Sequence, residues 1–254
     1  MNKRLWIVLG VIVVVFFGGL MWYNSTIKEE PVVDYSYVDE LDGSKMITKE
    51  DVIAAVEKTE NRTMTDEEKD NIIADHYIGN TDSKVVVVKW EDFACSHCQM
   101  TYEETEKMID KYSDRVLFVT RDFNLGYPSS DATLKTANAV AKLGGNEAFH
   151  KISDLLFQDE KWIMTTMPSG WKDILNGYVK EAGVDVDEYT RAYNNASING
   201  IDAKLERDAR LADKMGVTGT PTWMVNGEIV ENADVEAISN AIDAALKAAE
   251  VTEE

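Results

Sequence analysis

The sequence predicts an α/β fold in which a strand–helix–strand unit and a later strand–strand–helix unit enclose a long helical insertion. Two apolar runs, 85–90 and 115–123, flank a helical stretch that ends near Tyr112. From Ser129 to Met215 the pattern is helical throughout, and the strand period returns only afterwards. The first three elements form a βαβ unit, whose crossover is expected to be right-handed.

The strand over 85–90 is a continuous, valine-rich run, as expected for a strand buried on both faces. Within the insertion, one helix is expected to close at Gly144-Gly145 and another at Gly183, with two more before Gly216.

The C-terminal part of the chain predicts a hairpin and a closing helix. Asn226-Gly227 favours a two-residue turn between strands over 222–225 and 228–230. The following stretch, 234–249, repeats apolar residues at helical spacing.

Two segments precede this domain. Residues 24–47 are acidic, contain several tyrosines and lack apolar periodicity, so we expect a tether. The segment 48–80 contains two Thr-x-x-Asp/Glu patterns that mark helix starts. They predict short helices over 49–60 and 66–78, to which the sequence assigns no role.

The N-terminus predicts a membrane anchor. Residues 5–23 are uncharged and apolar, and they are about long enough to cross the hydrocarbon core of a bilayer. A basic pair precedes this stretch, whereas Glu29 and Glu30 follow it, so residues 1–4 should be cytoplasmic and the remainder extracytoplasmic. A cleavable signal peptide is the alternative, but no small-x-small cleavage site follows the stretch.

The chain is strongly acidic, with a formal net charge of −20. The two basic residues at positions 3 and 4 precede the apolar stretch, so the exported part carries 46 acidic against 24 basic residues. Such a charge repels nucleic acid and anionic lipid headgroups and keeps a tethered domain soluble. Nucleic-acid binding is therefore excluded as a function.

The only two cysteines, Cys95 and Cys98, are separated by Ser96 and His97 at the turn from the first strand into the helix. Thiols at this spacing can close a small, reversible disulfide. The first sulfur would lie at the positive end of the helix, where a thiolate is stabilised. Disulfide exchange needs such a thiolate and a second thiol that resolves the mixed disulfide.

Together with the order of elements, the motifs FACSHC at 93–98 and VTGTPT at 217–222 resemble the thioredoxin superfamily. The helical insertion resembles its DsbA-like branch of extracytoplasmic thiol:disulfide oxidoreductases. The resemblance covers roughly 80–250, which implies a thioredoxin-like domain over 81–254 with an insertion at about 129–215.

The resemblance implies a role for five residues. Cys95 would be the attacking thiolate and Cys98 the resolving thiol, while His97 holds the place of the histidine that tunes the potential in oxidising members. Pro221 would be the cis-proline, and with Thr220 it would offer backbone to an extended substrate. The implied substrates are exported thiol-containing proteins, and the implied partner is a membrane protein that recycles the dithiol. No cofactor or metal is implied.

The chain departs from the family at one position. Members usually carry a buried acid six residues before the first cysteine, where this chain has Lys89. Two neighbouring acids could take the place of the missing one: Glu91, which lies on the same side of the strand as Lys89, and Asp92. The Lys89 ammonium would favour the Cys95 thiolate, whereas a buried, deprotonated lysine would act as a base.

Three other functions remain open at this stage. The same dithiol could act as a reductase or isomerase, and the reduction potential would distinguish these activities. It could also bind Cu(I) as a metallochaperone, because soft thiolates suit that ion. A structural disulfide closing so short a loop would constrain the unfolded chain little.

Overall fold

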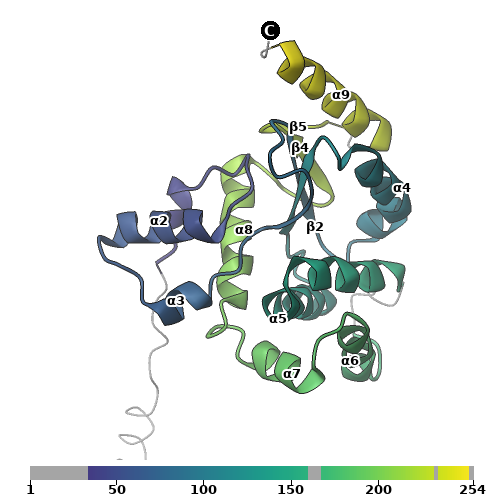
Figure 1. Ribbon diagram of the computed structural model, residues 1–254. Helices are drawn as coiled ribbons and strands as arrows, with labels where there is room; N and C mark the ends of the chain where they lie inside the picture. Colours follow the sequence, from purple (N-terminus) through teal and green to yellow (C-terminus); the bar gives the residue numbers. More distant parts are fainter. Residues whose placement is uncertain (1–33, 160–166, 232–233, 252–254) are drawn as a thin grey trace, which may run out of the picture. The chain divides into compact units, whose positions relative to one another are not determined.

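A mixed sheet with the strand order β1-β3-β2-β4-β5 organises the chain (Figure 1). The computed structural model describes residues 34–159, 167–231 and 234–251. The two central strands, β2 and β3, run parallel, and all other neighbours in this sheet run antiparallel. The strands are β1 (His76–Gly79), β2 (Val86–Glu91), β3 (Leu117–Asp122), β4 (Thr222–Val225) and β5 (Glu228–Ile229).

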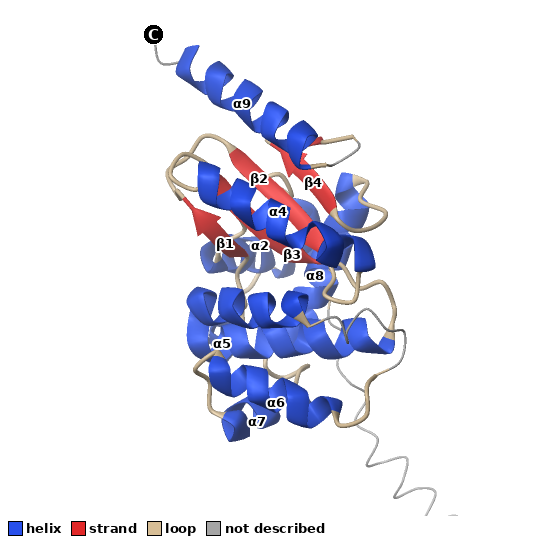
Figure 2. Cartoon of the chain, turned by 90° about the vertical axis from the view of Figure 1, so that its right-hand side faces the viewer, coloured by secondary structure: helices blue, strands red, loops and turns tan. Residues whose placement is uncertain are grey.

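Helices cover both faces of this sheet, as Figures 1 and 2 show. On one face, α4 (Ser96–Tyr112) connects β2 to β3 and packs with α9 (Val235–Val251). On the opposite face, α8 (Ile201–Met215) packs against β3. The predicted βαβ unit and the closing helix are therefore confirmed.

The helical insertion is also present. It contains α5 (Pro128–Gln158), α6 (Trp171–Glu181) and α7 (Val186–Asn194) and continues into α8. Gly145, with φ 75° and ψ −167°, interrupts the helical backbone inside α5 near the predicted stop. The apolar core of this region also includes Cys95 and Cys98, so the insertion packs directly against the dithiol.

The hairpin between β4 and β5 forms at the predicted turn. Asn226 and Gly227 have φ values of 47° and 91°, the left-handed backbone that a two-residue turn of this kind requires. The second strand is one residue shorter than predicted and ends at Ile229.

The predicted helix over 66–78 is wrong beyond its first turn. The Thr65 capping box is present, but α3 spans only Asp66–Asp70, and β1 follows. A capping box marks where a helix begins and cannot show where it ends. The four residues of β1 pair with β3, a partner some forty positions away, so no local pattern reveals them.

The predicted tether over 24–47 is wrong for its second half. A short 3₁₀ helix, η1 (Ser36–Glu40), begins a packed segment whose apolar side chains are buried. Arg121 of β3 donates hydrogen bonds to the carbonyl groups of Gly43 and Lys45. The next helix, α2 (Lys49–Glu60), is as predicted. The buried side chains of the segment are Tyr37, Val38, Leu41 and Ile47.

The predicted anchor over 5–23 lies outside the described residues, as do residues 1–4 and the first part of the predicted tether. Within the part that the structure describes, no helix has the length and apolar character needed to span a membrane.

Candidate active site

Cys95 caps the N-terminus of α4. Its Sγ accepts a hydrogen bond from the main-chain N–H of Cys98 at 3.3 Å. The turn that presents it is held by Asp92, whose carboxylate oxygens accept the main-chain N–H groups of Ala94 at 2.8 Å and Leu125 at 2.9 Å. Asp92 therefore serves as an anchor of the loop.

The loop before β4 faces the dithiol. The Thr220–Pro221 peptide bond is cis, as the resemblance implies. The Cys95 Sγ lies 3.4 Å from the carbonyl oxygen of Thr220, to which it donates a hydrogen bond when it is protonated. Residues 125 positions apart in the sequence are thus brought together, in the arrangement that the resemblance implies.

The two thiols have opposite acid–base properties. A hydrogen bond from the Cys98 thiol lowers the pKa of Cys95 to about 5, against the opposing effect of burial. The main-chain N–H groups of Cys98 and His97 add to this stabilisation. Burial, reinforced by the nearby Cys95 sulfur, raises the pKa of Cys98 far above its usual value. At neutral pH, Cys95 is the thiolate and Cys98 the thiol.

His97 lies on the surface of the first turn of α4, with an exposed side chain. Its main-chain N–H contributes to the low pKa of Cys95. Whether its imidazole tunes the reduction potential stays a prediction.

Lys89 and Glu91 form a buried ion pair, with 2.7 Å between Nζ and Oε2. Burial alone would lower the pKa of Lys89, but Glu91 and other anions hold it above its usual value, so its side chain is an ammonium. Burial raises the pKa of Glu91, and Lys89 offsets this only in part. The pair interacts electrostatically with Cys98, because Glu91 raises the pKa of that thiol.

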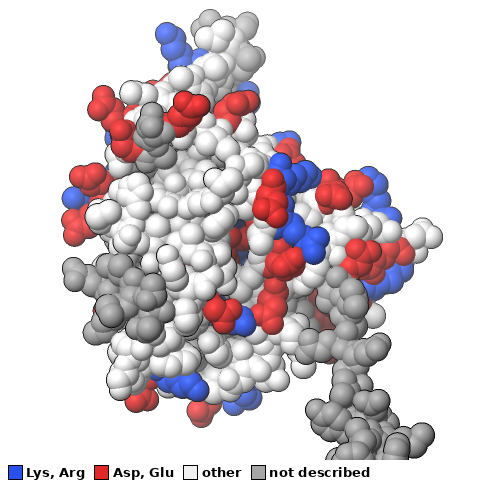
Figure 3. Space-filling model, turned by 180° about the vertical axis from the view of Figure 1, so that it is seen from behind, with Lys and Arg blue, Asp and Glu red and all other residues white. Residues whose placement is uncertain are grey.

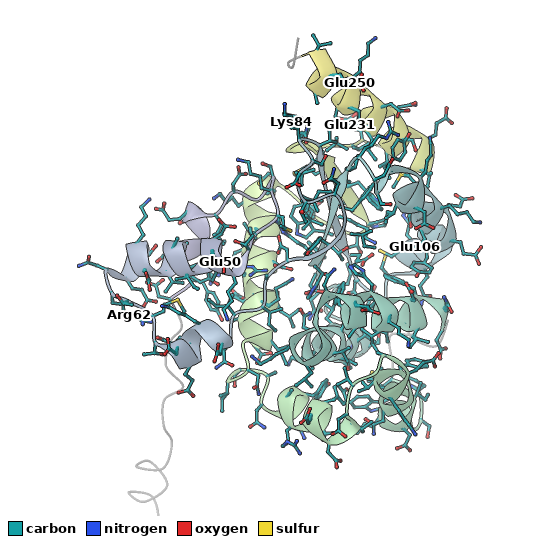
Figure 4. The ribbon with its side chains drawn as sticks, in the orientation of Figure 1. Glu50, Arg62, Lys84, Glu106, Glu231 and Glu250 are labelled. Atoms are coloured by element: carbon teal, nitrogen blue, oxygen red, sulfur yellow. The ribbon has the colours of Figure 1, made fainter. Side chains whose placement is uncertain are left out.

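The sequence reading missed Glu106, which α4 carries on the side that faces α5 (Figure 4). A cavity of about 20 Å³ lies between α4, α5 and the sheet. Glu106 lines it together with Lys89 and Glu91. The sequence contains a pattern that points to Glu106, because it follows Tyr102 by four residues and precedes Ile109 by three, a spacing that places the three side chains on one side of the helix. It therefore belongs to an inward stripe of α4.

The two other histidines lie away from the dithiol. His76 on β1 stacks on Phe149, with 3.6 Å between ring centroids, and hydrogen-bonds to Asn138. His150 donates a hydrogen bond from its Nε2–H to the carbonyl oxygen of Tyr77 at 2.8 Å. Both are occupied by contacts within the core.

The fold and the dithiol facing a cis-proline define a protein of the thioredoxin class. A family model described as Thioredoxin matches residues 70–244, and the chain belongs to that family.

Two groups of curated relatives are similar in sequence. The putative protein-disulfide oxidoreductase of Rickettsia bellii is 28% identical over 178 residues, which cover 68% of this chain and 65% of the relative. The probable disulfide bond formation protein D of Bacillus cereus is 29% identical over 188 residues, covering 67% of this chain and 78% of the relative. The chain thus spans slightly less than two thirds of the length of the rickettsial relative.

Solved structures share the fold. BdbD from Bacillus subtilis in its oxidised form has a TM-score of 0.60 at 21% identity and covers 68% of this chain and 93% of its own. The thiol-disulfide exchange protein alpha-DsbA2 from Wolbachia pipientis has a TM-score of 0.57 at 22% identity, covering 67% of this chain and 86% of its own.

Proposed function

We propose that this chain is a thiol:disulfide oxidoreductase that introduces or exchanges disulfides in exported proteins through Cys95 and Cys98. The observation that carries the proposal is the asymmetry of the two thiols: Cys95 caps α4, which favours its thiolate form, and faces the cis Thr220–Pro221 bond, whereas burial holds Cys98 protonated. A structural disulfide needs no such asymmetry. The names of the curated relatives, a putative protein-disulfide oxidoreductase and a probable disulfide bond formation protein, support it.

In the proposed reaction, a substrate thiolate attacks the Cys95 sulfur of the oxidised dithiol. The Cys95–Cys98 bond breaks, and a mixed disulfide between Cys95 and the substrate forms. A second substrate thiolate then attacks the substrate sulfur, which releases Cys95 as a thiolate and leaves the substrate oxidised. The low pKa of Cys95 makes it a good leaving group and favours this oxidising direction.

The substrate is proposed to lie along the loop of Thr220 and Pro221. A proline next to a strand leaves a neighbouring edge open to an added peptide strand. In Figure 2, β2 runs toward the lower right, where α4 begins, and Figure 3 views the molecule from that side. A broad area of this view carries no charged side chain, although the chain as a whole is strongly acidic.

The location of the protein is part of the proposal. We propose that the apolar stretch at 5–23 anchors the chain in the membrane with its N-terminus in the cytoplasm and the thioredoxin-like domain outside. An oxidase in that compartment must be reoxidised after each cycle, so we propose a membrane redox partner.

The test of the function is trapping of an intermediate. In Cys98→Ala the Cys95 thiolate can still attack a substrate disulfide, but no second thiol of the protein can resolve the mixed disulfide, so DTT-sensitive adducts between Cys95 and substrate proteins should accumulate on non-reducing gels. Cys95→Ala is the matched control and should trap nothing. Equal trapping by both variants would show that the assigned order of attack is wrong, and no trapping by either would refute the function.

The reduction potential of residues 34–254 tests the direction of the reaction. A value near or above about −150 mV indicates an oxidase, and one near about −270 mV a reductase. His97→Ala tests the imidazole on the same preparation. If its charge stabilises the Cys95 thiolate, the potential should fall by about 30 mV for each unit by which the pKa of Cys95 rises.

A further inference from the structure

We propose that the Asn146 carboxamide closes the outer edge of β1 to added peptide strands, and thereby restricts strand addition by unfolded substrates to the loop of Thr220 and Pro221. The inference rests on the proposed function, because it concerns where an extended substrate binds. Asn146 is a specificity-determining residue in this proposal and not a catalytic one.

The strand β1 lies at one edge of the sheet. It stands first in the strand order and pairs with β3 on its inner side. In Figure 2 it forms the left edge of the sheet, with α5 below it. In an antiparallel pair, alternate residues direct their main-chain N–H and C=O groups away from the partner, so an open edge is a template for another chain. An enzyme that meets extended, unfolded chains is exposed to such pairing.

The side chain of Asn146 occupies the outward main-chain groups of Tyr77, a residue inside β1. Its Oδ1 accepts the N–H of Tyr77 at 2.9 Å, and its Nδ2 donates to the carbonyl oxygen of Tyr77 at 2.7 Å. Two residues of neighbouring antiparallel strands exchange the same pair of bonds. His150 donates to the same carbonyl oxygen at 2.8 Å, so both of its lone pairs are used. An incoming strand would have to break three hydrogen bonds at Tyr77 to form two.

The two ends of β1 are closed in other ways. Asp75, two positions before Tyr77, donates its main-chain N–H to the carbonyl oxygen of Ile47 at 3.0 Å. Gly79 ends the strand with a φ of 104°, so the chain leaves the extended geometry that a strand partner needs. Tyr77 is therefore the residue of β1 whose outward groups α5 has to cover.

The interruption of α5 places the Asn146 side chain at this edge. The interruption is at Gly145, whose φ of 75° and ψ of −167° belong to a region that is essentially confined to glycine. A Cβ atom at this position would meet nothing within 4 Å, so the backbone conformation and not the available space requires glycine. Asn146 begins the second part of the helix, and His150 follows one turn later on the same side. Both side chains reach β1 from there.

The order of the strands shows why closing this edge matters for the proposed function. Because β3 and β2 lie between β1 and β4, a chain added to β1 would lie about 15 Å from the end of the sheet that carries the substrate loop. The carbonyl oxygen of Thr220, by contrast, lies 3.4 Å from the Cys95 Sγ. A substrate paired with β1 would be held away from the dithiol, and a second copy of the chain paired there would start an aggregate.

The experiment maps where an extended peptide binds. The probe is a thiol-free peptide of alternating threonine and valine with a photoreactive benzoylphenylalanine at its centre. It is illuminated with the full chain, and mass spectrometry locates the cross-links in the wild type and in Asn146→Ala. Asn176→Ala is the matched control, because Asn176 is a half-buried carboxamide of the same insertion that lines a pocket between α6 and α7. Gly145→Ala is a second variant that acts through the backbone.

In the wild type the cross-links should lie near 220–221, with none above background at 76–79. Asn146→Ala should gain cross-links at 76–79 by at least about fivefold, since two hydrogen bonds no longer compete with the peptide. Gly145→Ala strains the interruption of α5 and should open the same edge, whereas Asn176→Ala should follow the wild type. Equal labelling of β1 in the wild type and in Asn146→Ala would overturn the proposal.

Hydrogen exchange tests the closed edge without any variant. The Tyr77 amide of the wild type should exchange as slowly as the amides that pair β2 with β3, because Asn146 holds it, and exchange at the rate of an unprotected amide would also overturn the proposal. A wild type that does not exchange disulfides would refute the proposed function, but neither readout needs turnover. Normal exchange of Asn146→Ala with a small thiol, together with an unlabelled β1, would refute only the closing of the edge.

Discussion

On the face of the sheet that α8 covers, three buried cations meet three buried carboxylates, whereas on the α4 face the Lys89 ammonium meets three carboxyl groups of increasing exposure. The α8 network consists of Arg121, Arg207, Lys204, Asp75, Asp122 and Asp208. The acids on the α4 face are Glu91, Glu106 and Asp154.

Direct pairing satisfies the charges of the α8 network. Asp75 lies 2.8 Å from Arg121 and 2.9 Å from Arg207, and Lys204 lies 3.2 Å from Asp122. Arginine does not deprotonate in proteins, so this arrangement cannot change its charge without breaking. The network joins the N-terminal segment to the sheet, because Arg121 also bonds to main-chain carbonyl groups of that segment.

The acids of the α4 face can change their charge. Burial raises the pKa values of Glu91 and Glu106, so these carboxyl groups can take up a proton. Neither of them is paired with an arginine, so their protonation leaves no guanidinium group without its partner. The comparison indicates that the balanced buried charges of the α8 network stabilise the fold. The excess of acid on the α4 face, by contrast, can take up and release protons.

The largest effect is expected from Asp75→Ala. It leaves two buried guanidinium groups without their shared carboxylate, and such losses cost about 3–5 kcal/mol. Denaturant unfolding measures the change, with Glu103→Ala on the exposed side of α4 as a control expected within about 0.5 kcal/mol of wild type. A loss below about 1 kcal/mol for Asp75→Ala would mean that the α8 network contributes little to the stability of the fold.

Lys89→Met should cost less, about 1–3 kcal/mol at pH 7, because the abandoned Glu91 can neutralise itself by taking up a proton. Its folded-state pKa, already raised, would rise further above that of the unfolded chain. The folded state then binds more protons, so stability is lost as the pH rises. Unfolding at several pH values should show a larger cost near pH 8 than near pH 5, and a constant cost would contradict this account.

His76 next to the α8 network should weaken the protein in acid. Burial lowers its pKa to about 3, below the usual 6.5, so the unfolded state binds more protons between these values. His76 should therefore remove about 1.4 kcal/mol of stability for each pH unit below 6.5. His76→Phe, which keeps a ring against Phe149, should show a shallower loss between about pH 6 and about pH 4. Equal slopes in the two proteins would refute the prediction.

Glu106→Gln is expected to change how stability depends on pH. The pKa of Glu106 rises from 4.5 to about 7 on folding, so its contribution falls as the pH rises through that window. The stability of the variant relative to wild type should increase across the window and level off above it. Parallel pH profiles would mean that Glu106 does not hold its proton in the folded protein.

The predictions that held depended on residues close together in the chain. The strand over 85–90, Cys95 and Cys98 at a helix start, and the turn at Asn226-Gly227 are local patterns, and local backbone preference determines them. Pro221 was placed by its motif, and its position beside Cys95 follows from the order of the strands in the sheet.

Only the tertiary structure decided which polar side chains are buried together. Asp75 meets Arg121 and Arg207 from positions 46 and 132 residues away, and β1 exists because β3 pairs with it. The spacing along α4 places Glu106 on its inward stripe, but only the packing of α5 across it desolvates its carboxyl group. The sequence by itself determined the dithiol and the framework that presents it, because both depend on short-range patterns. The partners and proton affinities of the buried charges depend on long-range packing.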